Sequence, residues 1–365
     1  MKKIVHVITG LQQAGAETLL FRLVSSDVEN KHVIVSLTSM GYYGEILSKA
    51  GFEVHEINFT IGRLLGSSYK LFKVLSKHHT AVVHCWMYHA NFIGGIAAKF
   101  AGVNNVIWSV HHLDSKCLKG TAKIFSRLSA ILSRLLPNSI IYVSEESRDF
   151  HVNDGYFAKN AIVVHNFVDT NVYFFSDIRR FEFRKKYNIP NDAFVFGSVA
   201  RWHPIKGHVT LINAFSLLVQ EFPLRDYRLV LVGPGINNYN VELVQRLKEA
   251  KIISKVVLID AHSQLENVYP GLDVHVLASR KEAFGMATLE AIACGITTIS
   301  TDVGFARKFT SDYKLLFPVD NHHDLFVCMR YASDKENVQE RGDFALSDFT
   351  LLKAKAKYNN IWAHY

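Results

Sequence analysis

The stretch that decides the fold reads SRKEAFGMATLEAIACG and runs from Ser279 to Gly295. It completes a run of mostly apolar residues from Val274 that is typical of a buried parallel strand. The pattern predicts that this strand ends at Ser279 and that a helix begins near Gly285 and ends at Gly295. A loop between such a strand and the next helix lies at the carboxyl end of the sheet, where doubly wound proteins bind their ligands.

This stretch carries two carboxylates, one on each side of the predicted helix start. The backbone N–H groups of Phe284, Gly285 and Met286 would be unpaired there, and such groups form a ready site for an anion. Glu290 falls about one turn inside the helix, away from the apolar face, where a carboxylate can accept both hydroxyls of a ribose. Glu282 falls at the loop tip, where it can meet a sugar. A single glutamate on a helix is usually only solvated, but two of them around this turn favour a ligand site.

Two earlier segments have the same strand-to-loop character. Gly197–Gly207 reads GSVARWHPIKG and places Arg201 and Lys206 in a loop before a helix expected near His208. A guanidinium and an ammonium at that position suit a diphosphate. A shorter segment, LVGPG, places Gly233 at the end of a strand, where glycine lets a ligand or another backbone approach closely. Taken alone, the first segment is more often a pair of solvated charges and the second an ordinary strand end.

The rest of the chain alternates short apolar runs with helical patterns, which predicts parallel sheets covered by helices on both faces. Two such series predict an α/β protein with two doubly wound domains. We expect a first domain at 1–168, completed by a helix at about 349–365, and a second domain at 169–348. The expected strands are 4–9, 32–38, 53–58, 81–86, 105–111, 139–144 and 161–166, then 194–200, 228–233, 255–260, 274–279, 297–301 and 315–319. The apolar positions of the last helix are Leu351, Leu352, Ala356, Tyr358 and Ile361.

Composition narrows the class of protein. The chain has 365 residues, of which 49% are hydrophobic and 20% are charged, as is usual for a soluble globular protein. Its apolar runs are shorter than the roughly 18–20 residues that a membrane span needs. The four cysteines are scattered, with no pair at metal or redox spacing, which fits a reducing cytoplasm. The first residues, MKKIVHVITG, predict a strand and not a signal peptide.

The net charge of +8 is concentrated in one region. Between Arg63 and Leu136 there are ten basic residues and a single acid, Asp114. A local excess of this kind indicates an anionic partner, either a phosphate lipid or a nucleic acid. Five of the basic residues alternate with leucine, isoleucine and phenylalanine in a pattern that fits either a basic amphipathic helix on an anionic membrane or a core-packed helix with a solvated basic face. They are Lys116, Lys119, Lys123, Arg127 and Arg134.

Taken together, the three segments of the second half resemble the donor-binding half of the retaining glycosyltransferases of family four, which have the GT-B fold. The resemblance covers nearly the whole chain. Asn166–Asp169 reads NFVD and is similar to the family's Asn-Gly-Val-Asp, and Ala14–Glu17 reads AGAE and resembles its Gly-Gly-Ala-Glu loop. The resemblance implies two Rossmann-like domains facing across a cleft, with the last helix crossing back to the N-terminal domain. Departures such as Phe167 and Ala283, which replace glycines, affect loop geometry and remove no charged ligand.

The resemblance also implies roles for single residues. Arg201 and Lys206 would hold the donor diphosphate and stabilise the departing nucleotide, while Glu282 would contact the transferred sugar near C3 or C4. Glu290 would bind the ribose. His111, at a strand end, would lie near the sugar and the acceptor, although a lone histidine there is often structural. The remaining donor residues are Gly15, Gly233, Phe284, Gly285 and Met286.

The expected activity is retaining transfer of a hexose or N-acetylhexosamine from a nucleotide sugar, with UDP favoured over GDP. The acceptor would be a lipid-diphosphate-linked glycan in the biosynthesis of O-antigen, capsule or exopolysaccharide, at the inner face of the cytoplasmic membrane. No Asp-x-Asp follows a strand in a suitable loop and no histidine cluster has ligand spacing, so we expect neither a metal nor another cofactor. The leaving nucleoside diphosphate would take the acceptor proton on the same face, which gives retention.

Three alternatives remain open from the sequence. One is a mannosyltransferase that uses GDP-mannose, and another is a sugar-nucleotide epimerase of the same fold. The third is a non-catalytic protein that binds a nucleic acid or a partner transferase. The chain shows no DNA- or RNA-binding motif, and its basic region lacks the interleaved aromatics of a stacking platform. We therefore expect no nucleic-acid partner.

Overall fold

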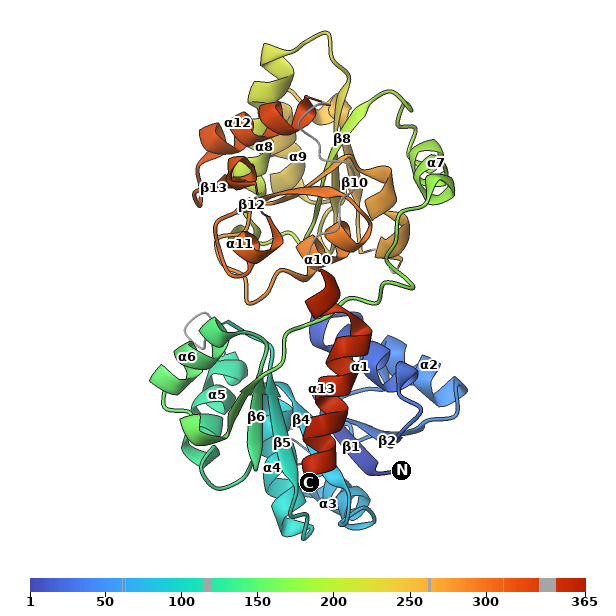
Figure 1. Cartoon of the computed structure of the whole chain (residues 1–365), viewed down its shortest axis with the longest axis vertical. Coiled ribbons are helices and arrows are strands. Elements are labelled where there is room, and N and C mark those ends of the chain that lie inside the picture. The colour runs from blue at the N-terminus through green and yellow to red at the C-terminus, as the bar shows by residue number, and fades with distance from the viewer. Residues whose placement is uncertain are drawn as a thin grey trace. The chain divides into compact units, whose positions relative to one another are not determined.

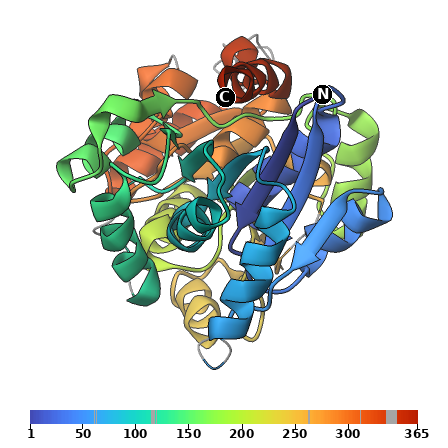
Figure 2. The ribbon, with the colours of Figure 1, turned by 90° about the horizontal axis from the view of Figure 1, so that it is seen from below.

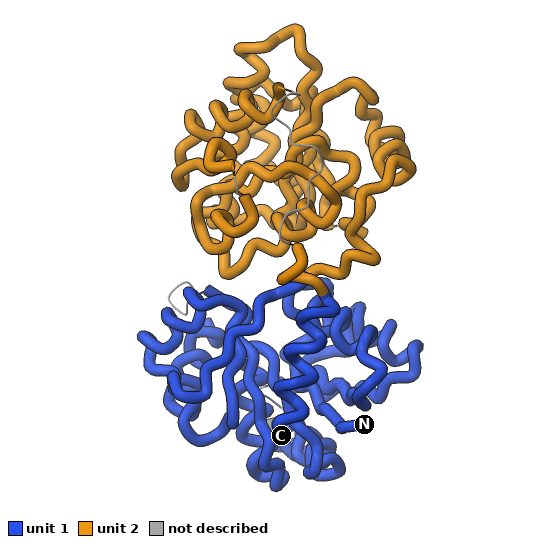
Figure 3. The backbone as a smooth tube through the Cα atoms, viewed as in Figure 1, with its two compact units in different colours: residues 1–167, 351–365 blue, residues 168–350 orange. Residues whose placement is uncertain are grey.

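The computed structural model describes residues 1–60, 62, 64–113, 118, 120–261, 264–310, 312–334 and 346–365. These residues form two compact units (Figure 3). The first unit contains Met1–Phe167 and Leu351–Tyr365, and the second contains Val168–Thr350. Each unit is built around its own parallel sheet. Among the described residues, no helix has both the length and the apolar character that crossing a bilayer requires.

The first unit has a seven-stranded parallel sheet in the order β3-β2-β1-β4-β5-β6-β7 (Figure 1). Its strands are β1 Lys3–Ile8, β2 Lys31–Ser36, β3 Glu53–Glu56, β4 Val82–Trp86, β5 Val106–Val110, β6 Ser139–Tyr142 and β7 Ala161–Val163. Its helices are α1 Gly15–Ser26, α2 Gly41–Lys49, α3 Leu64–Ser76, α4 Met87–Phe100, α5 Gly120–Leu132, α6 Glu145–Asn153 and α13 Leu351–His364. The strands are short and apolar because both faces of the sheet are covered.

The second unit has a six-stranded sheet in the order β10-β9-β8-β11-β12-β13. Its strands are β8 Phe194–Val199, β9 Tyr227–Val232, β10 Val256–Ile259, β11 Val274–Leu277, β12 Thr297–Thr301 and β13 Leu316–Phe317. Its α-helices are α7 Asp177–Lys186, α8 His208–Glu221, α9 Val241–Glu249, α10 Met286–Ala293, α11 Ala306–Phe309 and α12 His322–Ser333. Successive β8 residues point to opposite faces, so that Val195 and Phe196 belong to different core clusters. The predicted fold class, two doubly wound α/β domains, is confirmed.

Helix α13 covers one face of the first sheet (Figures 1 and 2). On β1, Val5 and Val7 belong to the main core, whereas the ring of His6 lies 5.6 Å from the ring of Trp362. Trp362 is fully buried, and its Nε1 donates to Nδ1 of His84 at 3.4 Å. Because residues alternate in direction along a strand, α13 lies on the face opposite that core. The last helix therefore returns to the first domain, as expected from the resemblance.

A buried arginine and a carboxylate join three elements of the second unit. Asp273, just before β11, accepts from Arg180 at 2.6 Å and from Arg184 at 2.8 Å, both on α7. The same carboxylate accepts from the backbone N–H of Val195 on β8 at 2.7 Å. Arg184 is only 1% exposed and also donates to the backbone carbonyls of Gly271 and Ala193. This arrangement fixes the start of β8 and β11, whose other ends carry the predicted ligand residues.

Candidate functional site

The ends of three neighbouring strands bring the predicted segments together. In sheet order β9, β8 and β11 are adjacent, and Gly233, Arg201 and Glu282 follow them in that order. The loop after β8 forms one backbone hydrogen bond with each neighbouring loop, at 2.8 Å to Pro234 and at 2.7 Å to Arg280. Parallel strands end at the same edge of a sheet, which explains why residues far apart in sequence share this edge.

Lys206 and Glu282 form the charged centre of this edge. The Nζ atom of Lys206 lies 2.6 Å from Oε1 of Glu282, and the two side chains are 22% and 13% exposed. The hydroxyl of Ser279 donates to the same carboxylate oxygen at 2.7 Å. The sequence predicts that Lys206 binds the diphosphate and that Glu282 contacts the sugar of the same ligand. In the structure these two side chains are in direct contact. Arg201 is exposed in the same loop.

Two glycines make the close packing of these loops possible. At Gly207, whose φ is +64°, an added Cβ would lie 1.9 Å from the carbonyl oxygen of Ala278. At Gly233, whose φ is +146°, it would lie 2.4 Å from the carbonyl oxygen of Ala200. Any other residue at either position would displace backbone. The close approach at Gly233 is therefore made by the protein's own loop, and Gly207 has a packing role that the sequence did not reveal.

Glu290 is held by a tyrosine that the sequence analysis missed. It lies on α10 with 9% of its surface exposed, and its Oε2 accepts from the hydroxyl of Tyr269 at 2.8 Å. Burial and the neighbouring Glu290 raise the pKa of Tyr269 well above its usual value, so the phenol stays protonated and donates. Tyr269 belongs to the 3-10 turn Tyr269–Gly271, and no sequence pattern links it to α10. The bond fixes the orientation of the carboxylate.

The start of α10 has open space beside its capping glycine. Gly285 caps the helix with φ of +95°, and an added Cβ there would meet no atom closer than 3.8 Å. The ring of Phe284 is 2% exposed and packs against Phe305, Phe309 and Phe349, with ring centroids 4.5–5.6 Å away. The aromatic cluster therefore anchors the loop that leads into α10. Met286 begins the helix and is half-buried.

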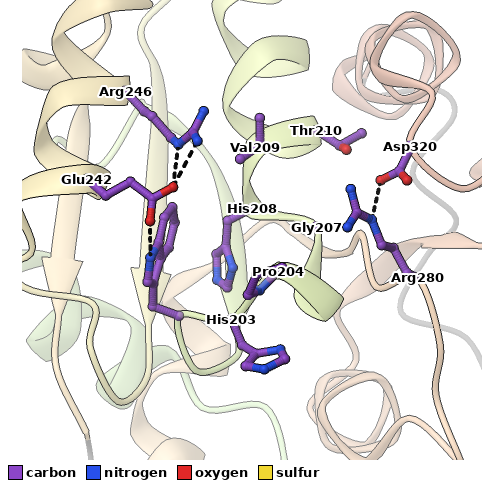
Figure 4. Close-up of a pocket in the computed structure, with 11 residues that line it drawn as sticks. His203, Pro204, Gly207, His208, Val209, Thr210, Glu242, Arg246, Arg280 and Asp320 are labelled. Carbon is purple, nitrogen blue, oxygen red and sulfur yellow. Dashed lines mark hydrogen bonds and ion pairs between the residues drawn. The ribbon is translucent and has the colours of Figure 1, made fainter. Parts of the chain in front are cut away.

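A pocket lies beside this edge and shares the loop after β8 (Figure 4). Its two arginines are paired, Arg246 with Glu242 at 2.8 Å and Arg280 with Asp320 at 2.8 Å. It contains none of the charged residues of the candidate site. The pocket is lined by Trp202, His203, Pro204, Gly207, His208, Val209, Thr210, Glu242, Arg246, Arg280 and Asp320.

In the first unit, His111 directly follows β5. Its ring stacks on Trp86, with centroids 5.2 Å apart and ring planes 13° apart. Burial and the adjacent His112 lower the pKa of His111 to about 3, against a smaller opposing effect of Asn166. The imidazole is therefore neutral at physiological pH. Gly15 is exposed at the first position of α1, and an added Cβ would find no atom within 4 Å.

Helix α5 exposes a stripe that is both apolar and basic. Lys123, Arg127 and Arg134 are exposed on this helix and just after it, and Ile124 and Ile131 between them are 58% and 71% exposed. The helix buries small residues, namely Ser126, Ser129 and Ala130. Beside them, Phe125 and Leu132 pack against the main core of the first unit. Helix α5 is therefore a core-packed helix whose exposed face is both basic and apolar. Lys116 and Lys119 lie outside the described residues.

Both halves of the chain match families of known glycosyltransferases. The family described as Glycosyltransferase Family 4 matches residues 4–172, and Glycosyl transferases group 1 matches residues 179–342. The O-antigen biosynthesis glycosyltransferase WclY of Escherichia coli is 27% identical over 188 residues, which is 50% of each protein. The UDP-Gal:alpha-D-GlcNAc-diphosphoundecaprenol alpha-1,3-galactosyltransferase of the same organism is 25% identical over 253 residues, 67% of this chain and 64% of that protein. The chain thus spans about half to two-thirds of the length of these curated relatives.

Among solved structures, HepE of Anabaena in complex with UDP and glucose has a TM-score of 0.86 and 19% identity over the full length of both chains. At that identity the likeness concerns the fold. The two family matches follow one another along the chain and leave only short segments uncovered. The chain belongs to glycosyltransferase family 4, with the glycosyl transferases group 1 domain in its second half and the GT-B fold.

Proposed function

We propose that this chain is a glycosyltransferase of surface-polysaccharide biosynthesis that transfers a hexose or N-acetylhexosamine from a nucleotide sugar, with UDP favoured, to a lipid-linked glycan. The observation that carries the proposal is the contact of Lys206 with Glu282 at 2.6 Å, at the sheet edge that also carries Arg201 and Glu290. Cations for a diphosphate, a carboxylate for a sugar and a carboxylate for a ribose are the groups that a nucleotide sugar requires. HepE, whose structure contains UDP and glucose, has the same fold.

In the proposed reaction, Lys206 and Arg201 bind the diphosphate and stabilise the charge that develops on it as the bond to the sugar C1 breaks. The acceptor oxygen forms the new bond to C1 on the same face of the sugar. Its proton passes to an oxygen of the departing diphosphate, so the anomeric configuration is retained. Glu290, oriented by Tyr269 at 2.8 Å, holds the ribose. No step of this reaction requires a metal ion.

The donor is identified by a thermal-shift screen of the full chain against UDP-, GDP- and ADP-sugars, followed by turnover with the best ligand. A rise in melting temperature with a UDP-sugar is expected, because a ligand that binds only the folded state stabilises it. NMR of the product should show the anomeric configuration of the donor, and EDTA should leave the rate unchanged. An inverted product or loss of turnover in EDTA would refute the mechanism. Donor epimerisation or hydrolysis without acceptor would instead favour an epimerase.

Replacing His111 with alanine is expected to reduce kcat by about 10- to 100-fold, the effect of losing one hydrogen bond to a charged group, and to change the Kd of the donor little. The side chain lies on the first unit, at the carboxyl end of β5, and the charged donor residues lie on the second. Because its pKa is about 3, the neutral ring should act as a hydrogen-bonding group, so the pH profile between 5 and 8 should keep its shape. Steady-state kinetics with isothermal titration of the donor measure both effects, and an unchanged kcat would remove His111 from the reaction.

The acceptor part of the proposal is supported by the exposed stripe on α5. Basic side chains next to exposed isoleucines suit the boundary between anionic headgroups and acyl chains. The name of the Escherichia coli galactosyltransferase refers to a diphosphoundecaprenol acceptor. We therefore infer that the chain attaches peripherally to the inner face of the cytoplasmic membrane, where a lipid-diphosphate-linked glycan is presented.

Changing Lys123 and Arg127 together to glutamine is expected to weaken binding to anionic vesicles by roughly 30-fold, because each basic residue near such a surface contributes about 1 kcal/mol. Vesicle flotation with phosphatidylglycerol against phosphatidylcholine measures the change. A matched control changes Lys185 and Lys186, which are exposed on α7, to glutamine and should bind like the unchanged chain. Equal binding of the unchanged chain to both lipids would contradict membrane attachment through α5, and a gel shift with DNA or RNA would support the nucleic-acid alternative.

A further inference from the structure

Two histidines and a glutamate from different elements meet at the edge of the first sheet. Glu53 and His55 lie two residues apart on β3, so their side chains point to the same face. His78 lies in the turn that follows α3. Oε1 of Glu53 lies 2.9 Å from Nε2 of His55 and 3.3 Å from Nε2 of His78. One ligand atom from each of the three residues lies within 4.8 Å of the other two.

These separations are those of ligands around one small cation. Zinc binds histidine nitrogen and carboxylate oxygen at about 2.0–2.1 Å in a tetrahedral arrangement, which places neighbouring ligand atoms roughly 3.3 Å apart. Two histidines and one glutamate supply three of the four positions, and a water molecule can supply the fourth. The sequence did not indicate this group because His78 comes from another element of the fold.

The buried histidine provides a second, independent observation. His78 is 7% exposed, its Nε2 has almost no surface accessible to water, and its contact with Oε1 of Glu53 at 3.3 Å does not have the geometry of a hydrogen bond. A buried polar atom without a partner costs free energy, and native structures contain few of them. This nitrogen faces the carboxylate of Glu53.

One neighbour opposes a metal ion. The ammonium of Lys3 lies 3.3 Å from Nδ1 of His78, where it donates to that nitrogen. When Nε2 binds a cation, Nδ1 carries the proton instead and can no longer accept this bond. Lys3 is half-buried at the start of β1, and its long side chain can turn its ammonium to solvent. Lys3 should therefore weaken the site without blocking it.

We propose that Glu53, His55 and His78 bind a divalent transition-metal ion, with Zn²⁺ as the ion that the ligand set favours. The site is structural and does not depend on the proposed transferase activity. Four strand spacings separate β3 from β5, which is roughly 19 Å across the sheet. Glu53 also opens its strand at the amino end, whereas His111 follows β5 at the carboxyl end. Bound metal would join the short edge strand β3 to the end of α3.

The test is titration of the EDTA-treated full chain with ZnCl₂, followed by calorimetry and thermal unfolding. One Zn²⁺ per chain and a higher melting temperature are expected. His55→Gln and Glu53→Gln should each weaken binding at least about tenfold, since even outer-shell changes have effects of that size. His79→Gln is the matched control, because His79 is adjacent and exposed but outside the cluster. Lys3→Met should bind Zn²⁺ more tightly than the unchanged chain.

Circular dichroism of each variant establishes that it folds, and His55 is the safer ligand to change because 31% of its side chain is exposed. The proposal is overturned if Zn²⁺ does not bind in the micromolar range, or if His55→Gln and His79→Gln reduce binding equally. Unchanged turnover in EDTA alongside a lower melting temperature would separate this structural site from the transferase reaction. A metal effect on turnover but not on stability would contradict it.

Discussion

Replacing Lys206 with alanine is expected to lower kcat for sugar transfer by about 100- to 1,000-fold, the usual effect of removing one preorganised group that stabilises developing charge. Lys206 lies 2.6 Å from Glu282, so the change removes the cation that we propose binds the diphosphate and leaves a partly buried carboxylate without its ion-pair partner. Both effects oppose the departure of an anionic leaving group. Steady-state kinetics with the donor identified by thermal shift measure the change.

A double-mutant cycle separates the two effects. Glu282→Gln keeps the size of the side chain and removes its charge, so the loss in Lys206→Ala should be smaller in this background than in the unchanged chain. Lys206→Arg keeps the positive charge with a different geometry and should retain more activity than Lys206→Ala. Additive effects of the two changes would mean that the contact has no part in catalysis. A rate within twofold of the unchanged chain for Lys206→Ala would refute the diphosphate role.

The candidate site could be predicted in part because it depends on strand ends. Arg201, Gly233 and Glu282 each follow a short apolar run, and apolar runs separated by helical patterns identify parallel strands. The carboxyl ends of parallel strands share one edge, so local patterns were sufficient to bring these segments together. The sequence could not show which backbone fills the space beside each glycine. Gly233, read as a possible ligand approach, packs against the carbonyl oxygen of Ala200.

Contacts between distant residues were beyond sequence reasoning. Tyr269 orients Glu290 through a hydrogen bond of 2.8 Å, and nothing in the spacing of the two residues indicates it. The last helix was predicted with Leu352 among its apolar positions, but Leu352 is 73% exposed and the buried residues are Ala354, Tyr358 and Trp362. A tryptophan whose N–H reaches His84 on β4 determines that face. Helical periodicity identifies apolar residues that share a face of the helix, but more than one face can fit the pattern. The surface on which the helix packs decides which face is buried.

Removing the carboxylate of Asp273 is the change expected to destabilise the fold most. It pairs with Arg184, whose side chain is 1% exposed, and removing one partner of a buried ion pair typically costs about 3–5 kcal/mol because the remaining charge is left without compensation. Asp273→Ala should therefore lower the urea midpoint of the second unit strongly. Asp273→Asn should lose less stability than Asp273→Ala, because the amide oxygen can still accept a hydrogen bond from the backbone N–H of Val195.

A surface ion pair in the same unit supplies the comparison. Asp226 contacts Arg228 at 2.8 Å and Lys255 at 3.4 Å, but its side chain is 33% exposed. Water screens such pairs, so Asp226→Ala should cost about 1 kcal/mol or less. If Asp273→Ala and Asp226→Ala lower the free energy of unfolding equally, α7 does not anchor β8 and β11 through Asp273. A larger loss in Asp273→Ala, together with weaker donor binding, would show that these buried contacts at the start of the strands also hold the loops at their other ends in place.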